Sequence, residues 1–121
     1  MRGDRHKGPS GHRSERLAQQ IREEVSQIVD FEMKDERIGF TTVTDVELTP
    51  DLSMARVFVS VTGTSEERRE SLAALNSAAG FVRTQLAPRI RVKRAPTISF
   101  LLDETLERGN RIEDLLKEDE Q

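Results

Sequence analysis

Cysteine, tryptophan and tyrosine are absent from the 121-residue chain, and phenylalanine occurs only five times. The absence of cysteine excludes disulfides and cysteine-based zinc sites, and it favours an intracellular protein. With so few aromatic side chains, stacking on nucleic-acid bases would contribute little to any binding. No apolar run approaches the roughly 20 residues that a membrane-spanning helix requires. We therefore expect a soluble, cytoplasmic protein with one domain and no membrane association.

The net charge of −3 conceals a strong segregation of charge along the chain. Residues 1–22 contain six cations and two acids, a net charge of +4. Residues 80–98 contain five cations and no acid, whereas residues 103–121 contain eight acids and three cations, a net charge of −5. This pattern is typical of a protein that binds a polyanion by electrostatic steering. Ordinary solvated surface and charged tails are the alternative interpretation.

The first half of the chain predicts one helix followed by a hairpin of two strands. Apolar residues recur every three or four positions and predict a helix from an N-cap at Ser14 to about Phe31. Segments 40–48 and 54–62 are rich in Val, Thr and Phe and predict strands, with a turn at 49–53. The second strand alternates, and one of its faces comprises Ala55, Val57, Val59 and Val61.

The second half predicts a long helix, a third strand and a short final helix. Thr64 and Glu67 have the spacing of a capping box, so the long helix begins after Thr64 and ends near Pro88. Residues 97–103 have the composition of a strand. A second pair of residues with capping spacing predicts a short helix within 110–116.

These elements follow the order α-β-β-α(kink)α-β, with a short C-terminal helix at the end. Because a helical crossover joins the second and third strands, the two should be parallel if they are adjacent. We expect an α+β two-layer sandwich in which the helices pack on one face of a three-stranded mixed sheet. The expected divisions are a flexible basic N-terminal arm at 1–13, the domain at 14–116 and an acidic C-terminal tail at 117–121.

Gly80 lies in the middle of the predicted long helix, where glycine costs about 1 kcal/mol relative to alanine. Close packing of another element against the glycine is one explanation. The small side chains of Ala78 and Ala79 also leave the backbone open to a ligand, and Arg83 follows one turn later. A helix that breaks and restarts exposes N–H groups and the positive end of a helix dipole, both of which suit a phosphate.

The segment "SAAGFVR" (77–83) resembles the Ala-X-Gly helix–kink–helix of the ribosome-binding factor A family. The resemblance extends to "DERIGFTTVTDVELTPDLSMARVFVSV" and "APTISFLLDETLERGNRIEDLL", and it covers about residues 14–116. It implies a type II KH-like fold. The GXXG loop with which KH domains usually clamp RNA is absent, and the resemblance places a kink at Ala78, Ala79 and Gly80 instead.

The resemblance also implies a function without enzymatic activity. Members of the family bind the free 30S ribosomal subunit, support late maturation and processing of the 16S rRNA 5′ end, and matter for growth in the cold. We expect the same partners here, namely the 30S subunit, its 16S rRNA and ribosomal proteins, with a monomer and no cofactor or metal. The candidate RNA-binding residues are Ala78, Ala79, Gly80, Arg83, Arg89, Arg91, Lys93 and Arg94.

Two other classes of function remain open from the residues alone. An enzyme would need oriented catalytic groups, but His6 and His12 both fall in the arm, and no nucleophile motif is present. Acids near strand ends could gather a metal, although such acids are more often solvated turn residues. These acids are Asp45, Glu47, Asp51 and Asp103. A protein-binding adaptor that docks through an edge of the sheet is the other class, and binding that resists high salt would favour it.

Side chains outside the basic cluster carry further expectations. Arg16 and Arg22 are not assigned to rRNA, because Glu23 and Glu24 are close enough to offset their charge. Phe81, beside Gly80, is the aromatic side chain to test for contact with a base. The phenylalanines of the predicted strands are expected in the core, and they are Phe40, Phe58 and Phe100.

Overall fold

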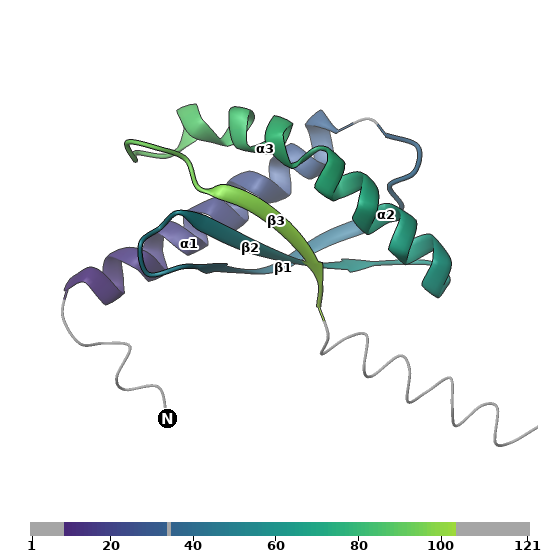
Figure 1. Cartoon of the computed structure of the whole chain (residues 1–121), viewed down its shortest axis with the longest axis horizontal. Coiled ribbons are helices and arrows are strands. Elements are labelled where there is room, and N and C mark those ends of the chain that lie inside the picture. The colour runs from purple at the N-terminus through teal and green to yellow at the C-terminus, as the bar shows by residue number, and fades with distance from the viewer. Residues whose placement is uncertain (1–8, 34, 104–121) are drawn as a thin grey trace, which may run out of the picture.

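A three-stranded mixed sheet forms one layer of the molecule, and the helices form the other (Figure 1). The computed structural model describes residues 9–33 and 35–103. Its elements are α1 (Pro9–Gln27), the π-helical turn η2 (Ile28–Glu32), β1 (Thr41–Leu48), β2 (Met54–Val61), α2 (Ser65–Ser77), α3 (Ala79–Leu86), the 3-10 turn η3 (Ala87–Arg89) and β3 (Thr97–Leu102). The predicted α+β class and element order are confirmed as far as β3.

The sheet has the strand order β1-β2-β3. β1 and β2 form the predicted antiparallel hairpin, and β3 lies parallel to β2 after the helical crossover. The register shifts between Val43 and Asp45, which indicates a bulge in β1. Strand alternation sets the buried face as predicted, and its residues in β2 are Ala55, Val57, Val59 and Val61.

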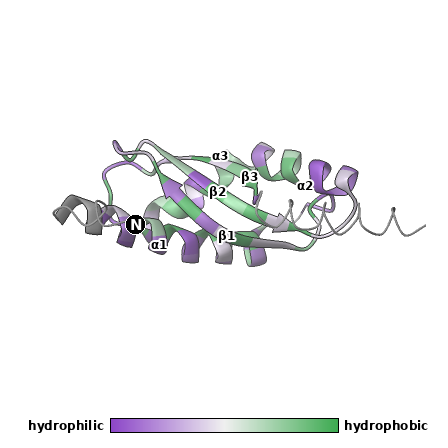
Figure 2. Ribbon diagram, turned by 90° about the horizontal axis from the view of Figure 1, so that it is seen from below, coloured by the Kyte–Doolittle hydropathy of each residue, from purple (hydrophilic) through white to green (hydrophobic). Residues whose placement is uncertain are grey.

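The core lies between the buried face of the sheet and the helices. α1 packs mainly on β1, whereas α2 and α3 pack on β3. Each helix contributes side chains that are fully buried, for example Ile21, Leu75 and Val82. Burial of one such side chain contributes about 1.5–3 kcal/mol to stability. Figure 2 shows hydrophobic residues interspersed with hydrophilic ones along the strands, and hydrophilic residues on the first turns of α2.

The start of α1 differs from the prediction. The helix begins at Pro9 and continues through Ser14, so Ser14 is not its N-cap. Proline suits the first turn of a helix, because the N–H that it lacks would have no partner within the helix there. Residues 1–8 of the predicted arm, the predicted helix within 110–116 and the acidic tail lie outside the described residues.

The predicted capping box at the start of α2 is confirmed. The Glu67 backbone N–H donates to Thr64 Oγ1 (3.1 Å), and the Thr64 N–H donates to Glu67 Oε1 (2.8 Å). The hydrogen bond from the Thr64 N–H and, to a lesser extent, that from the Thr64 side chain lower the pKa of the Glu67 carboxyl, because they favour its charged form. The capping box therefore fixes the position at which the chain, after leaving β2, begins α2.

The burial of the phenylalanine side chains differs in part from the prediction. Phe100 is buried, as expected, and Phe58 is half-buried. The prediction for Phe40 is wrong, because β1 begins at Thr41 and the Phe40 side chain just before it is 77% exposed. Phe31, at the end of the first helix, is 74% exposed.

Candidate nucleic-acid interface

The predicted interruption of the long helix is present, and it lies at Ala78 between α2 and α3. Ala78 has φ −96° and ψ 8°, outside the helical range of its neighbours. Its N–H donates to Ala74 O (3.1 Å), and its own carbonyl accepts from Val82 N (3.0 Å), so the chain turns without losing these bonds. The break therefore falls two residues before Gly80, which lies in the first turn of α3.

Gly80 faces open space. A Cβ added at this position would meet no atom within 4 Å outside the local helix backbone. Close packing within the described part of the chain therefore does not explain the glycine. The exposed backbone beside the break remains accessible to a partner, as the sequence predicts.

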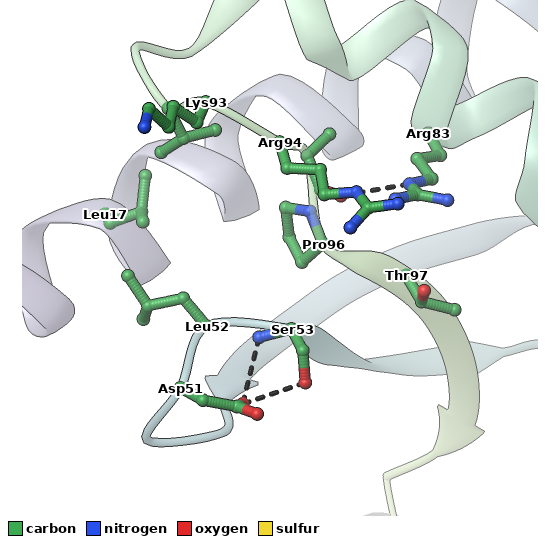
Figure 3. Close-up of a pocket in the computed structure, with 11 residues that line it drawn as sticks. Leu17, Asp51, Leu52, Ser53, Arg83, Lys93, Arg94, Pro96 and Thr97 are labelled. Atoms are coloured by element: carbon green, nitrogen blue, oxygen red, sulfur yellow. Dashed lines mark hydrogen bonds between the residues drawn. The ribbon is translucent and has the colours of Figure 1, made fainter.

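Arg83 ties α3 to the segment that leads into β3. Its Nε donates to the carbonyl oxygen of Ala95 (2.9 Å), as Figure 3 shows. The hydrogen bond crosses 12 positions of sequence and holds the guanidinium beside the 90–96 loop. Arg83 is half-buried, so it forms part of the wall of the site rather than a freely extended cation.

A cavity of about 610 Å³ opens between α1, the β1–β2 turn and the 90–96 loop (Figure 3). Three cations line it, namely Arg83, Lys93 and Arg94. Its other described lining residues are Leu17, Asp51, Leu52, Ser53, Val92, Ala95, Pro96 and Thr97. The cavity therefore combines apolar surface with cations from two separate segments of the chain.

A second cavity of about 500 Å³ continues this surface, since it shares Leu17, Leu52 and Val92 with the first. It adds three further cations, namely Arg13, Arg16 and Arg91. We call the two cavities together the basic groove. Its six cations are Arg13, Arg16, Arg83, Arg91, Lys93 and Arg94. Among the described lining residues, Asp51 is the one carboxylate.

The Asp51 carboxylate is held by hydrogen bonds within the β1–β2 turn. Its Oδ1 accepts from Ser53 Oγ (2.8 Å), Ser53 N (3.1 Å) and Thr49 Oγ1 (2.9 Å). These bonds, those from Ser53 first, lower the pKa of Asp51. No ion pair between Asp51 and a groove cation occurs among the described residues. Asp51 stays negatively charged, and the groove is positive because six cations line it against this one described carboxylate.

Leu52 adopts φ 62°, a left-handed conformation that disfavours leucine. A residue held in such a region costs about 1–3 kcal/mol and is often found at functional sites. The strained turn places Leu52 where it lines both cavities. The hairpin therefore supplies one of the three apolar residues that both cavities share, the others being Leu17 and Val92.

Arg89 differs from the prediction, because its side chain is paired with carboxylates of the same chain. Its Nη1 lies 3.4 Å from Glu24 Oε1, and its Nη2 lies 3.6 Å from Glu32 Oε1. Gln20 Nε2 also donates to the Arg89 carbonyl oxygen (3.1 Å). The expectation that Arg89 is uncompensated is therefore wrong. Its side chain joins η3 to the first helix, and it is not among the residues that line the groove.

Two arginines of the groove are not among the residues predicted to bind RNA. Arg13 and Arg16 lie one turn apart on α1, on the same stripe as Leu17 and Gln20, and all four line the second cavity. The helical spacing of these four residues is visible in the sequence. Their proximity to Arg91 is visible only in the fold. Arg22 lies elsewhere, and its Nη1 donates to Thr44 O (3.4 Å) on β1.

The four acids considered as metal ligands do not form a cluster that could coordinate a metal ion. Within residues 9–33 and 35–103, no group of three or more His, Cys, Asp or Glu side chains could hold a metal ion. Asp51 belongs to the hairpin turn, whereas Asp103 follows β3 and accepts from Thr44 Oγ1 (2.7 Å). In the same part of the chain, no helix combines the length and apolar character needed to cross a membrane.

The outer edge of β3 is covered at its centre. The Asn76 side chain accepts from Phe100 N (2.8 Å) and donates to Phe100 O (3.0 Å). This amide side chain takes the place that a further strand would occupy. Docking of a partner strand at this edge, as the adaptor alternative requires, would have to displace both hydrogen bonds.

Comparison with known proteins identifies similar sequences and structures. A family model described as ribosome-binding factor A matches residues 13–116. Ribosome-binding factor A of Thermodesulfovibrio yellowstonii is 52% identical over 106 residues, which are 88% of this chain and 89% of the relative. The crystal structure of ribosome-binding factor A from Thermus thermophilus has a TM-score of 0.67 and 28% identity, covering 74% of this chain and 93% of that chain. A homology model of the Thermus thermophilus factor, fitted into a cryo-EM map of a 30S complex, has a TM-score of 0.60 and 29% identity, covering 71% and 90%.

Proposed function

The chain belongs to the ribosome-binding factor A family, and on this premise we propose that it binds the free 30S ribosomal subunit by docking the basic groove on 16S rRNA. The observation that carries the proposal is the groove itself. α1, α3 and the 90–96 loop contribute its six cations, and its one described carboxylate is engaged by the hairpin turn. The 30S complex of the Thermus thermophilus factor supports the choice of subunit.

Phosphate contacts would supply most of the affinity. Each Lys or Arg that neutralises a phosphate releases counterions, so the affinity falls as salt rises. Such contacts position the protein without reading base identity, and selectivity then comes from the shape of the folded rRNA. The break at Ala78 and the exposed Gly80 add a second contact region, where an RNA backbone can approach the helix.

The proposed role in maturation is conformational rather than catalytic. A rigid positive surface stabilises the rRNA conformation that it fits, and this shifts the population of conformations in the subunit. We assign it to late maturation, where the favoured conformation supports processing of the 16S rRNA 5′ end in the cytoplasm. Alternative base-paired structures rearrange more slowly at low temperature, so the contribution is larger in the cold.

Cosedimentation with separated 30S subunits, 50S subunits and 70S ribosomes tests the proposal. The protein should pellet with 30S subunits at moderate salt and remain in the supernatant with the other two. Arg91→Ala/Arg94→Ala should reduce recovery, because both side chains are exposed in the groove. Arg56→Ala/Arg69→Ala removes the same charge outside the groove and should leave recovery unchanged. Equal recovery with all particles would contradict the proposal.

A further inference from the structure

The end of the molecule remote from the basic groove has the opposite charge. Two shallow cavities, of about 240 and 320 Å³, share Gly39 and lie around the loop that leads into β1. Their ionisable lining residues are Asp30, Asp35, Glu36, Arg37, Glu67 and Glu70. Among the described lining residues, Arg37 is the only cation. We call this surface the acidic end.

Arg37 forms an ion pair with Asp35, and it also interacts electrostatically with Glu70. Its Nη2 lies 2.7 Å from Asp35 Oδ2, and the side-chain hydrogen bonds of Arg37 hold the pKa of Asp35 at about 2. Apart from Asp35, the carboxylates of the acidic end are Asp30, Glu36, Glu67 and Glu70. A phosphate backbone would be repelled here, so this end is unsuited to the contacts proposed for the groove.

Two exposed phenylalanines accompany the carboxylates. Phe40 lines the 240 Å³ cavity, and its side chain is 77% exposed. Phe31 is 74% exposed and lies in sequence between Asp30 and Met33, which line the same cavity. Exposed aromatic side chains are typical of protein interaction surfaces.

The backbone that presents Phe40 is fixed by hydrogen bonds. Ser71, which is 2% exposed, accepts from Gly39 N (2.9 Å) and donates to Arg37 O (3.1 Å). The Phe40 carbonyl in turn accepts from Thr62 N (3.1 Å). The loop is therefore fastened to both α2 and β2. Such preorganisation lowers the entropic cost of binding a partner.

A π-helical turn presents Phe31. Met33 N donates to Ile28 O (3.2 Å), five residues earlier, so the turn is wider than that of an α-helix. Ile28 and Val29 remain buried in this turn while Phe31 faces solvent. Single π-turns of this kind are frequent at functional sites.

We propose that the acidic end binds a cationic protein segment, rich in Lys or Arg, on the same ribosomal particle that the groove binds. The inference rests on the proposed function, because the particle brings such a segment within reach. Lys and Arg side chains lay their aliphatic stems on apolar surface, place their cations over phenylalanine rings and pair with carboxylates. This combination matches a surface that has the exposed ring of Phe40, with that of Phe31 nearby in sequence, and the carboxylates of Asp30, Glu36 and Glu70. The fourth carboxylate, that of Glu67, is engaged by the cap of α2. The protein then contacts RNA at one end and protein at the other.

Site-specific photo-cross-linking identifies the class of partner. A benzoylphenylalanine replaces Phe31 or Phe40, and the protein is irradiated in complex with purified 30S subunits. The expected cross-link is destroyed by protease, survives nuclease, and maps to a peptide with several Lys or Arg residues. A nuclease-sensitive cross-link at both positions, or no protein cross-link at either, overturns the inference.

Affinity measurements give a second, independent test. Phe31→Ser/Phe40→Ser should weaken binding to 30S subunits by about tenfold, because aromatic contacts often dominate a protein interface. The slope of log K against log salt should stay unchanged, since no phosphate contact is lost. The matched variant Phe31→Tyr/Phe40→Tyr keeps both rings and should bind like the wild type. Wild-type affinity of the Ser variant overturns the inference.

The two proposals fail in different ways. Failure of the wild-type protein to sediment with 30S subunits refutes the proposed function. Wild-type sedimentation without a protein cross-link at the acidic end refutes only the present inference. Thermal unfolding of each variant checks the fold, which substitution of two largely exposed side chains should preserve.

Discussion

Replacement of Gly80 by alanine should change stability and binding in opposite directions. Gly80 is not among the residues with positive φ, and its added Cβ would meet no atom within 4 Å outside the local helix. Alanine is favoured over glycine within a helix by about 1 kcal/mol, partly because it restricts the unfolded chain. The variant should therefore be more stable by up to about 1 kcal/mol, which raises Tm by roughly 2–8 °C.

Binding of the same variant to 30S subunits should weaken. If an RNA backbone approaches α3 at Gly80, a methyl group inserted into that contact costs about 1–3 kcal/mol. The corresponding loss of affinity is roughly five- to 150-fold. Ala73→Gly on the exposed side of α2 is the matched control, because it exchanges the same residues with the opposite effect on stability. It should destabilise by about the same amount and leave affinity unchanged.

Urea unfolding and equilibrium cosedimentation separate the two effects. A Gly80→Ala protein that is less stable than the wild type would refute the reasoning about open space and backbone conformation. A stabilised protein with wild-type affinity would refute the RNA contact at the break and leave the groove as the sole proposed RNA contact.

Three further predictions concern individual contacts. Arg89→Ala should lower the free energy of unfolding by no more than about 1 kcal/mol, because its ion pairs are partly exposed. The same substitution should change the salt slope of 30S binding less than Arg91→Ala does. An equal change in slope for both variants would contradict the assignment of Arg89 to internal pairing. Asn76→Ala should lower the free energy of unfolding, measured in urea, by about 1–3 kcal/mol, because Phe100 N and O lose their partner. Unchanged stability would contradict a stabilising role for the Asn76 side chain at the edge of β3. Thr64→Ala should cost about 1 kcal/mol through loss of the cap, with unchanged affinity for 30S subunits.

Local patterns predicted most of the fold. Alternation in β2 identified its buried face, the spacing of Thr64 and Glu67 identified the start of α2, and the helical crossover implied the parallel pairing of β3. Each of these signals depends on residues close in sequence or on a general rule of chain connection. The interruption at Ala78 was also visible, as small residues followed by glycine, and it falls within the predicted kink at residues 78–80.

The composition of the site was harder to predict because it depends on contacts distant in sequence. The pairing of Arg89 with Glu24 spans 65 positions, so counting charges along the chain left Arg89 uncompensated. Arg16 was discounted because of its acidic neighbours in sequence, yet the fold places it with Arg91. Exposure of Phe40 was missed because a phenylalanine next to a strand is usually part of the core, and here the strand begins one residue later.

The salt dependence of binding to purified 30S subunits tests the role of the basic groove most directly. For the wild type, log K should fall linearly with log salt, and Arg91→Ala/Arg94→Ala should reduce the steepness by about 0.7–0.9 for each phosphate contact removed. Arg56→Ala/Arg69→Ala should retain the wild-type slope. A slope that is unchanged by loss of Arg91 and Arg94, or binding by the wild type that does not respond to salt, would contradict docking of this groove on rRNA.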